Sequence, residues 1–302
     1  MKVTRMSRPR VFEYIEAVAR LRSIRRAAEA LNVASSAVNR MILDYERELG
    51  TPIFERLPRG VRPTTAGEYL LAHIHRSRMD LETVQSQIDA LRGLGRGHVQ
   101  IAAIEAATPF VAAQLGHFHM SHRLISYSVQ VMGSPQVLSA VQQDQVELGL
   151  AINVKPTRQI AIAATQSYRL HAFVGVDHPL AQRESVRLND CVGYPVAMGD
   201  NTMGGRPMLE AAFGALLLDC RPFLTSNSFD LMIAAGRYTD AITFQFLPGR
   251  NQFVREAVTA VPVDDPHMQP AELSLVVNPR RPLPVAGALL VDVLAKAMAE
   301  GG

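Results

Sequence analysis

The sequence predicts a multidomain chain, in which a small helical unit and a long helix precede an α/β unit. Its 302 residues are too many for one ordinary domain, so two or three compact units are expected. Apolar residues recur at helical spacing as far as about residue 92, and short strand-like runs alternate with helical stretches from residue 98. Charged residues are also distributed unevenly along the chain. Residues 1–65 hold 13 Lys and Arg against 7 Asp and Glu, whereas the other residues hold 18 against 21.

Composition restricts the class of protein. With 48% hydrophobic and 20% charged residues, the chain can bury a sizeable core. It has no apolar run of about 18 residues, so we expect no membrane span and no membrane partner. The basic N-terminus leads into an amphipathic segment instead of an apolar signal sequence, which indicates a cytoplasmic protein. Cys191 and Cys220 stand far apart and predict two buried thiols, with a redox-sensing pair as the alternative.

The first 50 residues predict three short helices. The first has one apolar stripe, made of Phe12, Ile15, Val18 and Leu21. Ser23 is placed to cap the second helix, and Asn32 tolerates the left-handed conformation that ends it. Ser35 or Ser36 is expected to cap the third, and Gly50 to end it. The residues expected to face inward from the third helix are Ala37, Val38, Ile42, Tyr45 and Leu49.

Small residues lie where the second helix must contact its neighbours. Two helices that cross at a steep angle approach closely only if the contact is made by methyl groups or less, and Ala27 and Ala28 meet that requirement. This pattern is typical of a helix-turn-helix, although an ordinary helical hairpin would also fit. A short apolar run at residues 53–54, a polar turn at 58–60 and Val61 then predict a two-stranded wing. An excess of basic residues in this region favours a polyanionic partner.

The run "RAAEALNVASSAVNRMILDYERELGTPIFERLPRGVRPTTAG", residues 26–67, resembles the N-terminal winged helix-turn-helix of LysR-type transcriptional regulators. The resemblance lies in the Ala27-Ala28 pair, its spacing to Val33, the "ELG" and "IFER" segments and the closing Thr-x-x-Gly. It implies double-stranded DNA as a partner, with the third helix in the major groove. The residues that we expect to contact DNA are Arg26, Ser35, Ser36, Asn39, Arg40, Arg56, Arg59 and Arg62.

The polar positions of the third helix depart from the family pattern. The family usually has Val-Ser-Gln-Pro-Ala-Leu-Ser-Arg where this chain has "VASSAVNR", residues 33–40, so Ser35, Ser36 and Asn39 replace Gln, Pro and Ser. A serine hydroxyl discriminates poorly between bases, because it binds either base type or a phosphate. Asn39 can pair with adenine through two hydrogen bonds or bind a phosphate. The arginines of the wing can lie along phosphates or enter a minor groove.

A long helix is predicted to follow, over residues 66–92. Thr65 and Glu68 have the spacing of a capping box. Apolar residues then recur at steps of four and three, which is typical of a coiled-coil seam. The seam predicts pairing with a second copy of the chain, antiparallel if the family resemblance holds, and packing on the chain's own body is the alternative. The seam residues are Leu70, Ile74, Leu81, Val84, Ile88 and Leu91. A hinge is expected at residues 93–97.

Residues 98–302 predict an α/β domain with parallel sheets and helices on both faces. Strand-like runs are "VQIAAI", "ISYSVQVM", "VELGLAI", "YRLHAFVGV", "YPVAMG", "AITFQF" and "ELSLVV". The resemblance implies two subdomains, as in a periplasmic solute-binding protein, with the first at about 98–165 and 269–302 and the second at about 166–268. Ligands of such sheets bind beyond the carboxyl ends of the strands. The candidate effector-binding residues at those points are Thr108, Ser134, Asn201, Thr202, Ser226, Asn227 and Phe246. Glu105 lies near them and would suit an amine if it points into the cleft.

The sequence is therefore interpreted as a LysR-type DNA-binding regulator whose α/β domain binds a small-molecule effector. We expect effector binding to change the geometry of a homodimer or homotetramer on DNA, and the resemblance allows RNA polymerase as a further partner. No cofactor, metal site or enzymatic activity is expected, and His117, His119 and His122 are interpreted as surface residues. The alternative is a metabolite-binding or enzymatic α/β module whose helical head only oligomerises it.

Overall fold

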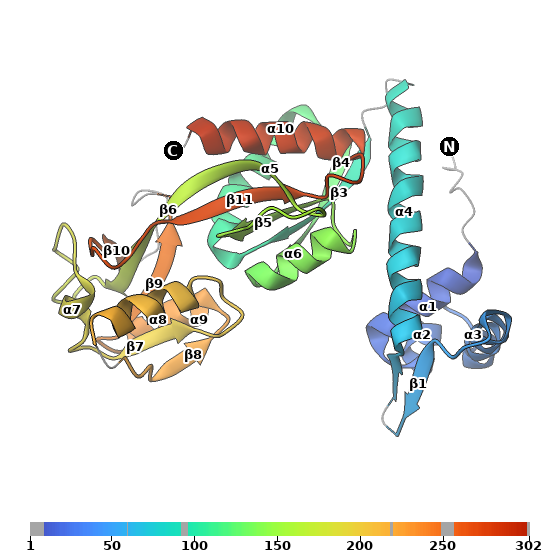
Figure 1. Ribbon diagram of the computed structural model, residues 1–302, viewed down its shortest axis with the longest axis horizontal. Coiled ribbons are helices and arrows are strands. Elements are labelled where there is room, and N and C mark those ends of the chain that lie inside the picture. Colours follow the sequence, from blue (N-terminus) through green and yellow to red (C-terminus); the bar gives the residue numbers. More distant parts are fainter. Residues whose placement is uncertain (1–8, 59, 92–95, 218–219, 249–256, 301–302) are drawn as a thin grey trace. The chain divides into compact units, whose positions relative to one another are not determined.

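The computed structural model of the chain describes residues 9–58, 60–91, 96–217, 220–248 and 257–300 (Figure 1). The chain divides into two compact units. One comprises Met1–Gln85 with Gln143–Gln145, and the other comprises Ser86–Gln142 with Val146–Gly302. Most of the predicted hinge lies outside the described residues. Among these residues no helix is long and apolar enough to cross a membrane.

The N-terminal unit has the expected helices and wing. Its elements are α1 (Arg10–Leu21), α2 (Ile24–Ala30), α3 (Ser35–Leu49), β1 (Phe54–Leu57), β2 (Gly60–Pro63) and the first turns of α4 (Thr65–Leu91). The Ser23 hydroxyl accepts a hydrogen bond from the Arg26 N–H at 3.3 Å, which confirms Ser23 as the cap of α2. Asn32 and Gly50 have φ angles of 53° and 68°, the left-handed conformation expected after α2 and α3.

Helix α3 begins differently from the sequence-based expectation. The residue before it is Ala34, which has an extended conformation and offers no side-chain cap. Ser35 and Ser36 lie inside the first turn and are exposed, so the prediction that one of them caps the helix is wrong. Ala37 is exposed and Leu49 is 45% exposed, so neither faces the core. The inward stripe of α3 is narrower than expected, because this helix buries only Val38 and Ile42 fully.

A carboxylate and a threonine hold the wing on the helices. Glu46 Oε1 accepts hydrogen bonds from the N–H groups of Ile53 and Phe54, at 2.8 and 3.0 Å. Thr64 donates its N–H to the Ile53 carbonyl, and its hydroxyl accepts from the Gly67 N–H at 3.1 Å. Thr64, and not Thr65, therefore caps α4, which corrects the predicted capping box. A Cβ at Gly67 would lie 2.0 Å from the Ile53 carbonyl oxygen, so the turn from wing to helix requires glycine.

The first turns of α4 belong to the core of the N-terminal unit. Ile74 is fully buried in one hydrophobic cluster with α1, α2 and α3, and Leu70 packs against that cluster. Phe12 of α1 contacts the His73 ring edge-on, and Glu16 lies 3.5 Å from His75. The prediction that Ile74 forms part of a dimer seam is therefore corrected, while Leu70 is covered only in part, because heptad spacing identifies an apolar stripe but not the partner that covers it.

The C-terminal unit contains every strand and helix that the sequence predicted, and several more. Its elements are β3 (Gly97–Ala103), η1 (Glu105–Ala107), α5 (Thr108–Ser121), β4 (Ile125–Val131), α6 (Ser134–Gln142), β5 (Leu148–Ile152), β6 (Ala161–Gly175), α7 (Leu188–Cys191), β7 (Val196–Gly199), α8 (Arg206–Ala215), β8 (Leu224–Ser226), α9 (Phe229–Arg237), β9 (Ile242–Leu247), β10 (Val258–Pro262), β11 (Ala271–Val277) and α10 (Val285–Glu300). The sequence patterns did not single out α7, β8 or β10.

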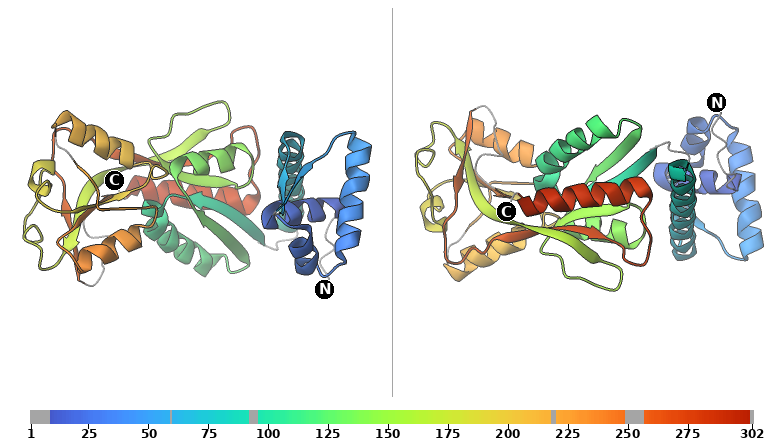
Figure 2. Two further views of the ribbon diagram at one scale, coloured as in Figure 1. Left: turned by 90° about the horizontal axis from the view of Figure 1, so that it is seen from below. Right: turned by 90° about the horizontal axis from the view of Figure 1, so that it is seen from above.

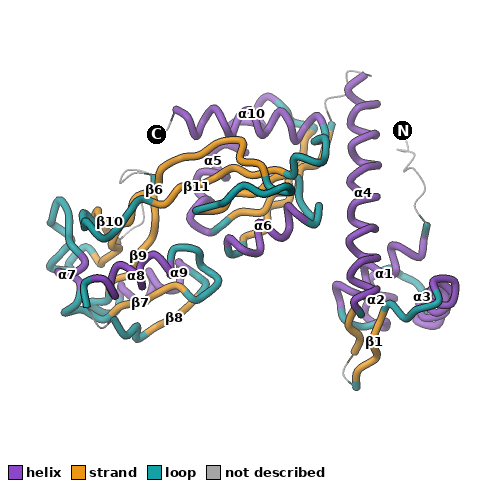
Figure 3. Tube along the Cα trace, viewed as in Figure 1, coloured by secondary structure: helices purple, strands orange, loops and turns teal. Residues whose placement is uncertain are grey.

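The strands are hydrogen-bonded in the order β4-β3-β5-β11-β6-β9-β7-β8, and β10 also pairs with β6. Strands β3, β4 and β5 are parallel, as are β7, β8 and β9, but β6 and β11 run antiparallel to their neighbours. The expectation of parallel sheets is therefore confirmed within these two groups and wrong for β6 and β11. Strand β6 changes partner along its length, from β11 at residues 161–168 to β9 at residues 169–173, and so joins two groups of strands (Figure 3).

Helices cover both faces of each group of strands. On the β3–β5 group, α10 and α6 lie on opposite faces (Figures 1 and 2). On the β7–β9 group, residues of α9 form one cluster with Phe173 and Leu247, whereas Phe213 of α8 contacts the Phe244 ring at 6.0 Å. We call the β3–β5 group with α5, α6 and α10 lobe I, and the β7–β9 group with α8 and α9 lobe II. Strand ends and helix N-termini of both lobes meet at one cavity.

Candidate functional site

The exposed side of the N-terminal unit links α3 to the wing. Arg56 of β1 donates a hydrogen bond from Nη2 to Asn39 Oδ1 of α3 at 2.7 Å. This contact joins two predicted DNA-binding residues that are 17 positions apart in the chain. It also occupies the side-chain oxygen, one of the two polar atoms that Asn39 would present to an adenine.

The other predicted DNA contacts lie exposed on the same unit. Arg26, Ser35, Ser36, Arg40 and Arg62 are all exposed, and Arg59 lies outside the described residues. Arg62 pairs with Glu55 across the wing at 2.6 Å, with 63% of its side chain exposed. Arg40 lies 3.9 Å from Asp44 and its side chain is 86% exposed. Surface ion pairs of this kind contribute little to stability, so these guanidinium groups can exchange a carboxylate for a phosphate.

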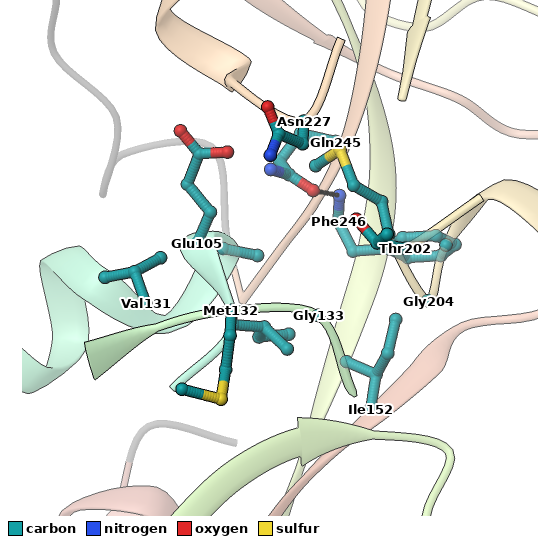
Figure 4. Close-up of a pocket in the computed structure, with 14 residues that line it drawn as sticks. Glu105, Val131, Met132, Gly133, Ile152, Thr202, Gly204, Asn227, Gln245 and Phe246 are labelled. Atoms are coloured by element: carbon teal, nitrogen blue, oxygen red, sulfur yellow. Dashed lines mark hydrogen bonds between the residues drawn. The ribbon is translucent and has the colours of Figure 1, made fainter. Parts of the chain in front are cut away.

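The C-terminal unit has a cavity of about 100 Å³ between strand ends of the two lobes (Figure 4). Segments of both lobes line it, and its members are Ile104, Glu105, Ala106, Val131, Met132, Gly133, Ile152, Thr202, Met203, Gly204, Gly205, Asn227, Gln245 and Phe246. Helices α6 and α8 begin beside it, so their backbone N–H groups add positive electrostatic potential there. A volume below the usual range of about 300–1,000 Å³ limits this form of the cavity to a small ligand.

Three of the seven predicted effector-binding residues line this cavity, namely Thr202, Asn227 and Phe246. Thr108 lies instead beside a second cavity of about 330 Å³, where its hydroxyl donates to the Glu105 carbonyl at 2.8 Å. Asn201 is exposed and lines neither cavity. Ser134 and Ser226 also line neither cavity.

Local hydrogen bonds explain these placements. The Ser134 hydroxyl is buried and accepts from the Ile152 N–H at 3.2 Å, and the Ser226 hydroxyl accepts from the Ser228 N–H at 3.0 Å. The Ser134 hydroxyl thus joins the start of α6 to the end of β5, and the Ser226 hydroxyl stabilises the turn between β8 and α9. The Thr202 hydroxyl donates to Asp200 at 2.6 Å, and this hydrogen bond, together with that from the Thr202 N–H, holds the pKa of Asp200 below its ordinary value.

Glu105 connects the two lobes. It follows β3 of lobe I, and both of its carboxylate oxygens accept from the N–H of Phe229, at 3.0 and 2.9 Å. Phe229 is the first residue of α9 in lobe II, so the carboxylate lies at the positive end of a helix dipole. Glu105 lines both cavities. The sequence indicated this residue only as one near the expected cleft.

Several residues of the cavity carry no signal in the sequence. Gln245 lies inside a buried strand between two phenylalanines, where its amide looks like part of the sheet. Met132, Ile152 and Met203 are apolar and are not distinguishable from core residues by pattern. Only the rule that strand ends converge could have indicated Gly133 and Gly204.

At Gly133 the backbones of the two lobes approach each other closely. A Cβ at this position would lie 2.0 Å from the Thr202 carbonyl oxygen, which belongs to the other lobe and to the backbone, so no side chain can move to relieve the contact. We expect Gly133→Ala to destabilise the observed form by about 1–3 kcal/mol. Thermal unfolding of the full chain should show a fall of about 2–4 °C per kcal/mol for a unit of this size.

Gly116→Ala is the matched control for that substitution. A Cβ there meets nothing within 4 Å, and the residue lies exposed within α5. Alanine in a helix interior should raise stability by about 0.5–1 kcal/mol. Equal effects of the two substitutions would show that the lobes do not meet at Gly133.

The structure also bears on two other kinds of site, a metal site and a redox-sensing pair of cysteines. Among the described residues, no group of three His, Cys, Asp or Glu side chains is arranged to hold a metal ion. Cys191 and Cys220 are not joined in a disulfide, and burial raises the pKa of the Cys191 thiol to about 12. A thiol with that pKa is almost entirely protonated at neutral pH and reacts slowly with oxidants.

Both units of the chain match known protein families. Residues 9–68 match the description "Bacterial regulatory helix-turn-helix protein, lysR family", and residues 92–299 match "LysR substrate binding domain". The chain is 25% identical over 258 residues to the uncharacterized HTH-type transcriptional regulator YybE of Bacillus subtilis (strain 168), a match that covers 85% of this chain and 88% of YybE.

Solved structures agree with this fold. Full-length CbnR complexed with its target DNA aligns with a TM-score of 0.69 at 16% identity, over 96% of this chain and 99% of CbnR. The effector binding domain of QuiR in complex with shikimate aligns with a TM-score of 0.59 at 16% identity, over 68% of this chain and 98% of QuiR. With family matches to both units, the chain belongs to the LysR family of transcriptional regulators, and it has the helix-turn-helix and the substrate-binding domain of that family.

Proposed function

We propose that α3 and the wing bind the two sides of one DNA half-site. The observation that carries this proposal is the Arg56–Asn39 hydrogen bond, which joins the helix to the wing on an exposed and basic surface. In this arrangement Ser35, Ser36, Asn39 and Arg40 enter the major groove, while Arg26, Arg56, Arg59 and Arg62 neutralise phosphates or reach the minor groove. The structure of CbnR on its target DNA supports this use of the fold.

We also propose a domain organisation that serves this function. Residues 1–65 would be the DNA-binding domain, 66–92 the dimerisation helix, 93–97 the hinge and 98–302 the effector-binding domain. Leu81, Val84 and Ile88 remain as candidate contacts with a second copy, since Leu81 and Ile88 are half-buried and Val84 is 42% exposed. The side chain of Leu91 lies outside the described residues. Dimerisation would place two heads on an inverted repeat.

The cavity between the lobes is proposed as the effector site. A ligand that prefers one arrangement of the lobes would shift the dimer or tetramer between geometries on DNA, by no more than its difference in affinity for the two. Such a regulator would act in the cytoplasm, where its DNA is, and would change transcription through its position relative to RNA polymerase.

Asn39 is the residue with which to test base recognition. If it pairs with adenine, Asn39→Ala should relax the preference at one base pair by about 1–3 kcal/mol, or about 5- to 150-fold, and leave the other positions unchanged. The measurement is selection of bound sequences from a random duplex pool, made with the wild type and the variant.

Ser35→Ala is the comparison, because a serine hydroxyl discriminates weakly and its loss should change the selected sequences little. A uniform loss of affinity in Asn39→Ala, with the selected sequence unchanged, would assign Asn39 to phosphate contact or to the support of Arg56. No recovery of DNA by either protein would reject DNA binding by this head.

A further inference from the structure

A buried side-chain amide lies in the wall that the two cavities share. The residues that line both cavities are Glu105, Ala106, Val131 and Gln245. Of these four, Gln245 alone is buried, with 8% of its surface exposed. It belongs to β9, every residue of which is buried. Glutamine is uncommon at such a position, because its amide must find hydrogen-bond partners away from water.

The backbone fixes the orientation of the Gln245 amide. Its Oε1 accepts a hydrogen bond from the Phe246 N–H at 3.2 Å, and this contact identifies the other end of the amide as Nε2. Figure 4 shows the hydrogen bond as a dashed line, with the amide nitrogen turned away from it. Within the described part of the chain, Nε2 has no hydrogen-bond partner. The carboxylate of Glu105, which lines the same cavities, therefore does not satisfy it.

An unpaired donor at this depth requires an acceptor from outside the chain. A buried N–H group without a partner is costly, whereas an apolar side chain of similar shape has no such cost. Because Nε2 belongs to a side chain in the wall of two cavities, the acceptor that can reach it is an oxygen within them, either of water or of a ligand. A ligand that displaces the water keeps the hydrogen bond only if it places an oxygen at the same point.

The surroundings also favour an oxygen over a cation. Helices α6 (Ser134–Gln142) and α8 (Arg206–Ala215) begin beside the smaller cavity, so the positive ends of two helix dipoles lie there. A protonated amine would meet these ends and the Nε2 donor, all of the same sign. A carbonyl or carboxylate oxygen would meet donors. No lysine, arginine or histidine occurs among the described residues that line either cavity, so dipoles and not a cationic side chain would bind the oxygen.

We propose that Gln245 determines the specificity of the effector cavity, by donating from Nε2 to a carbonyl or carboxylate oxygen of a small ligand. This inference rests on the proposed role of the cavity as the effector site, and adds a specificity-determining residue and a class of ligand. A site with a buried donor discriminates against compounds that lack the acceptor, since the donor then loses its water without replacement. The volume of about 100 Å³ limits the part of the ligand in the smaller cavity to a few non-hydrogen atoms.

Three compounds with equal numbers of non-hydrogen atoms test the class. Thermal unfolding of the full chain is measured with butanone, propionate and butylamine, each over a range of millimolar concentrations, with the ionic strength kept constant by sodium chloride. We expect the oxygen compounds to raise Tm in proportion to their affinity, and protonated butylamine to leave it unchanged. Butanone has a neutral acceptor and propionate a charged one, so the larger of their two shifts identifies the natural acceptor as a carbonyl or a carboxylate.

Two variants assign the effect to Gln245. Gln245→Met keeps the approximate length of the side chain but removes the donor, and it should lower the affinity for the oxygen compounds about three- to tenfold. Gln245→Asn keeps the amide but withdraws the donor by one methylene group, and it should lower the affinity as well. The matched control is Gln166→Met, the same change at a strand residue that is 4% exposed and lines neither cavity. Tm without ligand shows whether each variant is folded.

Contrary results separate the residue from the cavity. An equal rise of Tm in the wild type and both Gln245 variants would show that Gln245 does not determine specificity. Ala106→Leu, which adds bulk to the shared wall, then tests the cavity itself. If Ala106→Leu abolishes the rise, the cavity is still the binding site. If the rise persists there too, the compounds bind elsewhere and the effector-site proposal fails with it. A rise with butylamine alone, or with no compound, would contradict the ligand class.

Discussion

Replacing Arg59 and Arg62 of the wing with alanine is expected to weaken binding to duplex DNA of any sequence by about 10- to 100-fold at about 0.1 M salt. Each phosphate contact contributes a factor of about eight under those conditions, because it releases a condensed counterion. The slope of log affinity against log salt should become shallower by about 0.9 for each contact that is lost. Fluorescence anisotropy of labelled duplexes over a series of salt concentrations measures both quantities.

The control is the double variant Arg158→Ala with Arg280→Ala. It removes two exposed arginines from the C-terminal unit and so changes the net charge by the same amount. If both double variants lower affinity equally, the effect comes from overall charge and not from the wing. A wild-type affinity that hardly responds to salt would contradict phosphate binding by this head altogether.

Ile74→Ala is expected to lower the free energy of unfolding of the N-terminal unit by about 2–5 kcal/mol. Ile74 is fully buried among the residues of α1, α2 and α3, and removal of three methyl or methylene groups there leaves a cavity that the helices can close only in part. Hydrogen exchange of the amides of α1 and α3, in the full chain, measures this loss without requiring the two units to unfold together.

Val84→Ala separates that effect from dimerisation. Val84 belongs to the same heptad pattern as Ile74 but is 42% exposed. Its truncation should therefore hardly change hydrogen exchange in α1 and α3. It should instead shift the monomer–dimer equilibrium in sedimentation experiments at low protein concentration. If Ile74→Ala dissociates the dimer while exchange in α1 is unchanged, Ile74 belongs to the subunit interface after all.

Local patterns were sufficient to predict the N-terminal unit, since its features depend on residues that are close in the chain. Ala27 and Ala28 permit the close helix contact and are almost fully buried, and Gly50 adopts the left-handed conformation that ends α3. The residues that cap the helices were less predictable, because neighbouring serines or threonines can each occupy the capping position. Thr64 caps α4 where Thr65 was expected, since Thr64 is the residue that the wing holds in place through Ile53.

The α/β class of the C-terminal unit was predictable from alternating strands and helices, but strand direction was not. Antiparallel pairing of β6 and β11 brings the end of the chain back beside residues 161–168. An apolar run reads the same in either direction, so the pattern of residues carries no information about it.

The residues of the candidate cavity were likewise predictable only in part. Strand-end reasoning located Thr202, Asn227 and Phe246, because polar or aromatic residues after strands are recognisable in the sequence. The structure places Ser134 and Ser226, which the same reasoning selected, outside the lining of the cavity, since a hydroxyl at a strand end can satisfy the backbone as readily as a ligand.

By itself, the sequence determined the class of protein and the helix-turn-helix with its wing, and it located three strand-end residues of the cavity. Only the tertiary structure decided which side chains meet there. Glu105 and Phe229 are 124 positions apart, and their contact depends on how two lobes close rather than on any local pattern. Ile74 is a second example. Its position in the heptad pattern predicts that it is buried, but only the packing of α4 on α1 shows which residues bury it.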